Sequence, residues 1–174
     1  MTSAAPTVCT IDIVTGDEIL ERADALGLPE RERAAWSRVS QGYRLAGVFA
    51  ESAGRLLAAA LVTARPATAA RKIVGAYVAD GDHAELRGAV DALLDCVIDT
   101  AVEAGAAVVT WQREASAAAP SPREAMLQDA AVQRGFAPLR SPESSGAGSE
   151  GFTGSALWLN GWRDVELPYY RQTT

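Results

Sequence analysis

The sequence predicts a single mixed α/β domain, and three observations point to this fold class. Short apolar segments rich in β-branched residues, of the kind that form strands, recur along the 174-residue chain. Longer segments between them carry apolar residues at helical spacing. The order along the chain is strand, two helices, three strands, helix, strand, helix and two strands, which is typical of a layered domain.

The N-terminal part begins with a strand and two helices. Residues 8–14 alternate and are β-branched, which predicts a strand. Residues 15–17 supply a turn and an N-cap for a helix that runs to about Leu26 and ends at Gly27. Pro29 lies in the first turn of a second helix, which runs to about Ser40.

A hairpin and a further strand follow these helices. Residues 43–50 and 55–63 predict two strands joined by a tight turn at 51–54. The run Leu-Leu-Ala-Ala-Ala-Leu in the second segment is also compatible with a helix. We favour a strand because a turn precedes the run and Arg65-Pro66 stops it. Residues 72–79 predict the next strand.

The most regular helix of the chain opens at Glu85, directly behind that strand, and Gly105 is its natural C-terminal stop. Residues 106–111 predict a short strand of the kind that lies in a sheet covered on both faces. Pro120-Ser121-Pro122 leads into another helix, to about Arg134. The helix that opens at Glu85 has apolar residues at helical spacing, namely Leu86, Ala89, Val90, Leu93, Val97 and Ala101.

Two strands and a tail complete the prediction. Gly135-Phe136 turns the chain into a strand near 137–140, and a Gly- and Ser-rich loop at 141–154 precedes a last strand at 154–159. We expect a domain over residues 1–160, with residues 161–174 as a C-terminal tail or linker.

Composition and charge exclude several classes of function. The formal net charge of −6 and the sequence pI near 4.8 argue against a nucleic-acid-binding protein, which would carry a basic patch. The acidity favours a cationic substrate such as an amine. Because no apolar run approaches the ~20 residues that span a bilayer, we expect no membrane segment.

The cysteine and histidine residues of the chain argue against a metal site. With His83 the only histidine and no metal-ligand spacing around Cys9 or Cys96, we expect no metal site. Both cysteines are interpreted as buried thiols of a reducing compartment. The N-terminus lacks the features of a signal peptide, so a cytoplasmic location is expected.

Two sequence blocks carry a resemblance to a known family. Residues 72–105 hold a strand, a loop, a helix with Ala92-Leu93-Leu94 and a closing Gly, and residues 133–136 read Gln-Arg-Gly-Phe. In this order they resemble the GNAT superfamily of acyl-CoA N-acyltransferases. The resemblance implies a mixed, mainly antiparallel sheet with helices on both faces. It also implies acetyl-CoA-dependent acetylation of a primary amine of a small molecule or a peptide.

The resemblance also implies which residues bind acetyl-CoA. Backbone groups of Ala76, Tyr77 and Val78 would hold its pantetheine arm. The family's pyrophosphate loop falls on residues 85–90, where only Gly88 matches the motif, so the loop is degenerate. The cofactor-binding residues implied for this loop are Leu86, Arg87, Gly88, Ala89 and Val90.

The departures from the loop motif leave two interpretations. Glu85 puts a negative charge near the phosphates, and Val90 adds bulk where the backbone should approach them. Arg87 would compensate by binding the phosphate with its guanidinium group. Alternatively, the Glu85 carboxylate only stabilises the first turn of the helix through its interaction with the helix dipole, and no ligand binds there.

The catalytic residues of the family are also incomplete in this chain. The position of the family's tyrosine acid falls on Ala131, and the 72–79 strand holds no carboxylate for a general base. Tyr77 on the strand, or His83, Asp80 and Asp82 in the loop, are available as substitutes, and we predict Tyr77 and His83 as the catalytic residues. A solvated loop histidine is the alternative interpretation of His83. Trp111 and Glu18 are the predicted contacts to the acceptor, although a core position and a solvated helix face explain them equally well.

The last residues suggest a second hypothesis. Residues 167–174, Leu-Pro-Tyr-Tyr-Arg-Gln-Thr-Thr, resemble the lead-in to papain-like cysteine peptidase domains of the bacteriocin-processing kind. The chain would then be an inactive recognition domain or subunit that serves a downstream enzyme domain or partner chain. A docking tail is the alternative interpretation of this segment.

Overall fold

The computed structural model describes residues 9–42, 44–63, 70–114, 119–138 and 152–159. Within these residues strands and helices follow one another in the predicted order. Their bounds are β1 Thr10–Thr15, α1 Glu18–Leu26, α2 Glu30–Gly42, β2 Leu45–Ser52, β3 Arg55–Thr63, β4 Ala70–Val78, α3 His83–Glu103, β5 Val108–Glu114, α4 Pro122–Gln133, β6 Ala137–Pro138 and β7 Phe152–Trp158.

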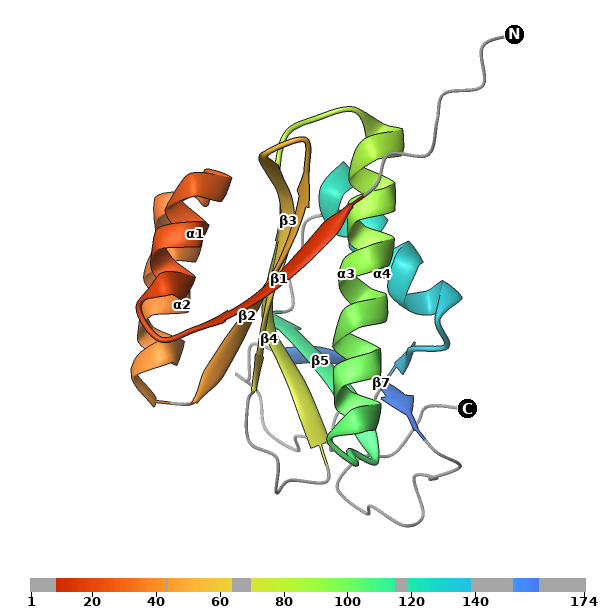
Figure 1. Cartoon of the computed structure of the whole chain (residues 1–174). Coiled ribbons are helices and arrows are strands. Elements are labelled where there is room, and N and C mark those ends of the chain that lie inside the picture. Colours follow the sequence, from red (N-terminus) through yellow and green to blue (C-terminus); the bar gives the residue numbers. More distant parts are fainter. Residues whose placement is uncertain (1–8, 43, 64–69, 115–118, 139–151, 160–174) are drawn as a thin grey trace, which may run out of the picture.

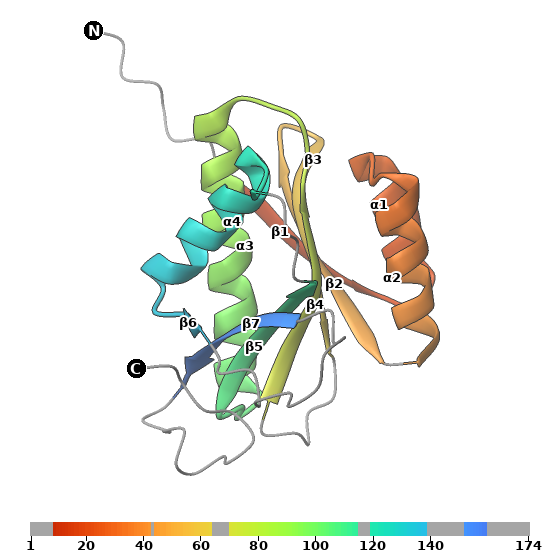
Figure 2. The same cartoon turned by 180° about the vertical axis from the view of Figure 1, so that it is seen from behind.

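The described strands form one sheet in the order β1-β2-β3-β4-β5-β7-β6. All neighbouring pairs are antiparallel except β4 and β5, which are parallel. Helices α1 and α2 cover one face of the sheet, and α3 and α4 cover the other (Figures 1 and 2). The predicted mixed, mainly antiparallel sheet with helices on both faces is confirmed.

Residues 55–63, whose sequence is compatible with a strand or a helix, form the central strand β3. Residues 57–61 of this strand are at most 1% exposed. A strand covered on both faces buries every side chain, which explains why its sequence is continuously apolar rather than alternating. Ala53 and Gly54 form the hairpin turn before it with φ of 50° and 77°, the conformation that two-residue hairpin turns require.

Strand β4 contains a bulge in its middle. Gly75 pairs with Leu61 and Ile73 pairs with Val62, so Val74 is the extra residue. A Cβ atom at Gly75 would lie 2.7 Å from Nε1 of Trp36, which is buried on α2. The missing side chain therefore lets the indole ring lie directly on the backbone of β4.

Several element ends differ from the prediction. Helix α3 begins at His83 rather than Glu85, because the Asp82 carboxylate accepts hydrogen bonds from the N–H groups of Ala84 and Glu85 and nucleates an earlier turn. Strand β5 continues to Glu114 because its last residues pair with β7. Residues 139–151 and the tail at 160–174 lie outside the described residues.

The two cysteines are partly rather than fully buried, and neither forms a disulfide. Cys9 and Cys96 both pack against the core between the sheet and α3. Burial is the main cause that raises the pKa of each thiol. The Glu85 carboxylate raises the pKa of Cys9 further, and Asp99 and Glu103 do the same for Cys96.

Candidate functional site

Strands β4 and β5 pair over only part of their length. Residues 70–73 pair with residues 108–111, and the register ends at Ile73 and Trp111. Beyond this point β4 pairs with β3 on one side, and β5 pairs with β7 on the other. The two parallel strands therefore separate, and the C-terminal half of β4, residues 74–78, faces the separation with one backbone edge.

The backbone of Val78 shows which groups face the separation. Its carbonyl oxygen accepts a hydrogen bond from Arg123 Nη1 at 3.4 Å. The N–H of Ala79 instead donates to the carbonyl oxygen of Leu57 on β3 at 2.8 Å. Because backbone groups alternate along a strand, those of Ala76 point the same way as those of Val78, and those of Tyr77 point toward β3.

Arg123 spans the separation from the first turn of α4. Its Nη1 donates to the hydroxyl oxygen of Tyr77 at 3.2 Å as well as to Val78, and its Nη2 pairs with the Asp80 carboxylate. A capping box of Ser121 and Glu124 holds this turn of α4 in place. No local pattern predicts this role of Arg123, because nothing in the sequence links it to residues more than 40 positions earlier.

The N-terminus of α3 lies directly beyond the end of β4. The Asp82 carboxylate accepts from Ala84 N at 3.0 Å and from Glu85 N at 3.2 Å, and Leu86 N donates to the Asp82 carbonyl oxygen at 2.9 Å. The segment that resembles a pyrophosphate loop is therefore helix. The N–H groups from Leu86 onward are engaged inside the helix.

The residues of this segment divide between the core and the surface. Leu86, Ala89 and Val90 are buried in the core under the sheet. Gly88 is exposed, and an added Cβ atom would meet nothing within 4 Å. Arg87 donates to the Asp91 carboxylate at 3.2 Å and to Gln133 Oε1 at 2.5 Å, so it joins α3 to α4 instead of pointing to the helix N-terminus.

The negative charge of Glu85 has a partner across the turn. Arg55, the first residue of β3, forms an ion pair with the Glu85 carboxylate. Its Nη1 also donates to the carbonyl oxygen of Asp80 at 3.4 Å. Arg55 and Arg123 thus both contact Asp80, one from β3 and the other from α4.

The predicted catalytic residues lie at this same end of the sheet. Tyr77 is partly buried, and its hydroxyl group bonds to Arg123. His83 is the exposed first residue of α3. The structure therefore brings Ala76, Tyr77, Val78 and His83 together with Arg55 and Arg123.

The two predicted acceptor contacts lie elsewhere. Trp111 is 4% exposed and belongs to the core on the α3 face, at the point where β4 and β5 separate. Glu18 is exposed at the start of α1, where it pairs with Arg22 at 3.8 Å. Its helix follows Thr15, the last residue of β1, at the opposite end of the sheet from Val78.

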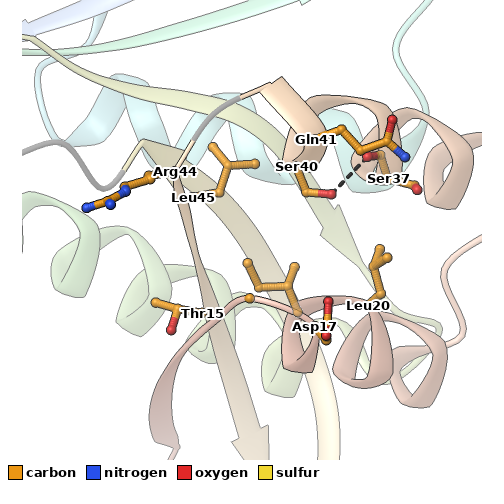
Figure 3. Close-up of a pocket in the computed structure, with 10 residues that line it drawn as sticks. Thr15, Asp17, Leu20, Ser37, Ser40, Gln41, Arg44 and Leu45 are labelled. Atoms are coloured by element: carbon orange, nitrogen blue, oxygen red, sulfur yellow. Dashed lines mark hydrogen bonds between the residues drawn. The ribbon is translucent and has the colours of Figure 1, made fainter.

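A pocket of about 640 Å³ also lies at that opposite end. Ser37, Ser40 and Gln41 of α2 face Asp17 and Leu20 across it (Figure 3). Leu45, which forms part of its wall, pairs with Thr63 at the end of β3, whereas Val78 pairs with Ala58 near the start of β3. The pocket is therefore separated from the α3 N-terminus by the length of the central strands.

Two further findings concern the described residues. No helix among them is both long and apolar enough to cross a membrane. Within the same residues no group of three or more His, Cys, Asp or Glu side chains is arranged to hold a metal ion.

Comparison with known proteins gives matches at the level of structure. No protein-family model matches the sequence, and a search of curated proteins found no match. The ribosomal-protein-S18-alanine N-acetyltransferase from Escherichia coli superposes with a TM-score of 0.60 at 17% identity, over 87% of this chain and 94% of that one. The IAA acetyltransferase from Bacillus cereus gives 0.59 at 14% identity, over 86% and 100% of the two chains.

A third match was solved with a ligand. A GNAT family acetyltransferase from Elizabethkingia anophelis with acetyl-CoA bound gives a TM-score of 0.59 at 14% identity, over 87% of this chain and 98% of that one. At such identities the likeness concerns the fold. The chain has the fold of the GNAT-family acetyltransferases.

Proposed function

We propose that this chain is an acetyl-CoA-dependent N-acyltransferase that acetylates a primary amine of a small molecule or a peptide. The observation that carries the proposal is the separation of β4 from β5, with the backbone edge of Ala76 and Val78 facing it. The matched structure with bound acetyl-CoA supports the same ligand for this fold. Bound acetyl-CoA supplies an activated acetyl thioester.

The pantetheine arm would lie along the free edge of β4. Its amide groups would pair with the backbone of Ala76 and Val78, as an added strand pairs with a sheet edge. Tyr77 would contribute its side chain, because its backbone points toward β3. Arg123 would have to release the Val78 carbonyl oxygen, a hydrogen bond of 3.4 Å that is easily exchanged.

The phosphates would lie over the first turn of α3. Leu86, Ala89 and Val90 fasten this helix to the sheet, while Arg87 and Gly88 lie on its outer side. The residues fit the ligand if the carboxylates of Asp82 and Glu85 are displaced from their present partners. The degenerate loop would then bind acetyl-CoA more weakly than an intact loop does.

Acid and base functions would fall to Tyr77 and His83. The Tyr77 hydroxyl group, which accepts a hydrogen bond from Arg123, would give a proton to the departing thiolate, and His83 would accept one from the amine. Holding the amine against the thioester supplies much of the rate by proximity alone. Trp111 would contact the acceptor where β4 and β5 separate. Glu18, at the opposite end of the sheet from Val78, could contact only an acceptor long enough to reach the α1 surface.

Calorimetry with acetyl-CoA on the 174-residue chain tests the proposal. Gly88→Asp adds negative charge on the outer side of α3, where a side chain meets open space, so it should lower acetyl-CoA affinity without unfolding the domain. Gly42→Asp, at the end of α2 and equally open, is the matched control. Absence of binding at millimolar acetyl-CoA would refute the proposal.

Two observations favour the alternative, an inactive recognition domain that serves a downstream cysteine-peptidase-like domain or a partner chain. The first amides of α3 already bond to a carboxylate, and Arg123 already occupies the separation. The tail that suggested such a domain lies outside the described residues. A pull-down with the intact chain would identify a partner of the inactive domain. We propose a cytoplasmic location for either function.

A further inference from the structure

Two arginine side chains converge on the turn between β4 and α3. Arg55 comes from the start of β3 and contacts the carbonyl oxygen of Asp80 and the Glu85 carboxylate. Arg123 comes from the start of α4 and contacts the Asp80 carboxylate. We propose that these two guanidinium groups bind the diphosphate of acyl-CoA, in place of the backbone amides that a loop would supply.

This inference rests on the proposed function and adds residues that the resemblance does not provide. The amides of Ala84 and Glu85 already donate to Asp82, and the amides that follow are engaged in the helix. A diphosphate at this turn therefore finds few free backbone donors. Its charge must be balanced by side chains.

Arg55 and Arg123 suit this role by geometry and by chemistry. They flank Asp80 from opposite elements, so two adjacent phosphates can each face one guanidinium group. Guanidinium groups bind phosphate bidentately, as they bind carboxylate. Each of the two is now held by a carboxylate in an ion pair that is open to water on at least one side: Arg55 is 52% exposed, and the Asp80 side chain is 91% exposed.

The cost of exchanging these partners is small. Solvent-exposed ion pairs contribute little to stability, so a phosphate can replace Asp80 or Glu85 without a large penalty. The other arginines near α3 differ in this respect. Arg87 joins α3 to α4 through Gln133, and Arg134 joins the two helices through Asp91. Arg134 is 16% exposed and has a second partner in Asp95.

The experiment compares Arg55→Gln, Arg123→Gln and a matched control. Arg33→Gln is the control because Arg33 also forms an exposed ion pair, with Asp24 at the α1–α2 surface. Affinity for CoA is measured by calorimetry. Affinity for S-acetylpantetheine, which lacks the diphosphate, is measured by ligand-observed NMR. Circular dichroism establishes that each variant is folded.

We expect each of the two substitutions to weaken CoA binding by roughly ten- to a hundredfold, the effect of losing a charge-assisted hydrogen bond. Binding of S-acetylpantetheine should not change, and Arg33→Gln should bind both ligands as the unmodified chain does. If both variants bind CoA like the control, the inference is overturned and the acyltransferase remains. An equal loss of both ligands also overturns it. If the unmodified chain binds no CoA, the proposed function fails and the inference fails with it.

Discussion

The two halves of β4 differ in the strands with which they pair. Residues 70–73 pair with β3 or β5 and hold Ile73, which is 1% exposed. Beyond the bulge at Val74, residues 75–78 pair with β3 alone, and the Val78 carbonyl oxygen accepts a hydrogen bond from the side chain of Arg123 instead of from a neighbouring strand. A side chain can leave such a group and a neighbouring strand cannot, so the second half of β4 can accept a ligand without loss of sheet structure.

The largest expected difference between the halves is in stability. Ile73→Ala removes a fully buried side chain beside α3 and should lower the free energy of unfolding by about 2–5 kcal/mol. Val74→Ala, at the partly buried bulge residue, should cost about 1 kcal/mol. Urea denaturation measures both values. Equal costs would contradict the distinction between the two halves.

A catalytic effect should be confined to the separated half. Tyr77→Phe removes the hydroxyl group that Arg123 contacts, and we expect kcat for acetyl transfer to fall roughly a hundredfold because a proton donor is lost. The free energy of unfolding should change little. Steady-state kinetics with the best amine acceptor from a screen measures the effect, and an unchanged kcat would remove Tyr77 from the reaction.

The two glycines that border the site should respond in opposite ways. Gly75→Ala places a Cβ atom against the Trp36 ring and should destabilise the domain by about 1–3 kcal/mol. Gly88→Ala, on the open outer side of α3, should stabilise it by up to about 1 kcal/mol because alanine favours a helix. Thermal unfolding distinguishes them. A stabilised Gly75→Ala variant would show that Trp36 moves freely over β4.

Substitutions of Asp82, the N-cap of α3, should change the stability of the domain and its affinity for CoA by different amounts. Asp82→Ala removes the cap and should cost about 1 kcal/mol, whereas Asp82→Asn keeps a capping oxygen and should cost a few tenths. Asp82→Asn also removes a negative charge near the phosphates and should raise CoA affinity roughly two- to fivefold. Calorimetry and urea denaturation measure the two effects. Lower CoA affinity in Asp82→Asn would contradict the expected phosphate position.

The smallest expected effect is a change in the reactivity of a cysteine thiol. Glu85 raises the pKa of Cys9, so Glu85→Gln should lower that pKa and speed alkylation of Cys9 at pH 8, while Cys96 is unaffected. Iodoacetamide labelling followed by mass spectrometry measures both thiols in one sample. Equal acceleration at both would indicate loosening of α3 rather than an electrostatic effect.

The same two thiols should make the stability of the folded chain decrease at alkaline pH. Their pKa values are raised in the folded state, so the folded chain binds more protons than the unfolded chain at alkaline pH. Their contribution to stability is complete below the ordinary thiol pKa of about 8.5 and is lost as the pH rises through the raised values. A Cys9→Ser, Cys96→Ser double variant should show a weaker loss of stability between neutral and alkaline pH.

Local patterns were sufficient for most of the fold. The order of the elements follows from apolar periodicity and from the glycine and proline residues that end helices and strands, as at Gly27. The mainly antiparallel sheet was expected from the resemblance to the GNAT superfamily. The first turn of α3 was predicted to begin at Glu85, because a capping side chain at Asp82 carries less signal in the sequence than the apolar residues that follow. The short β6 and the extended β5 depend on pairing with β7, a contact distant in sequence.

The sequence by itself therefore determined the layered fold, because strand, turn and helix signals are local and additive. Tertiary structure alone decided that Arg87 joins α3 to α4 and that Arg55 and Arg123 meet at Asp80. These contacts join residues 25 to 46 positions apart in the sequence. Their partners are chosen by which elements the packing of the core brings together, and no local pattern specifies that choice.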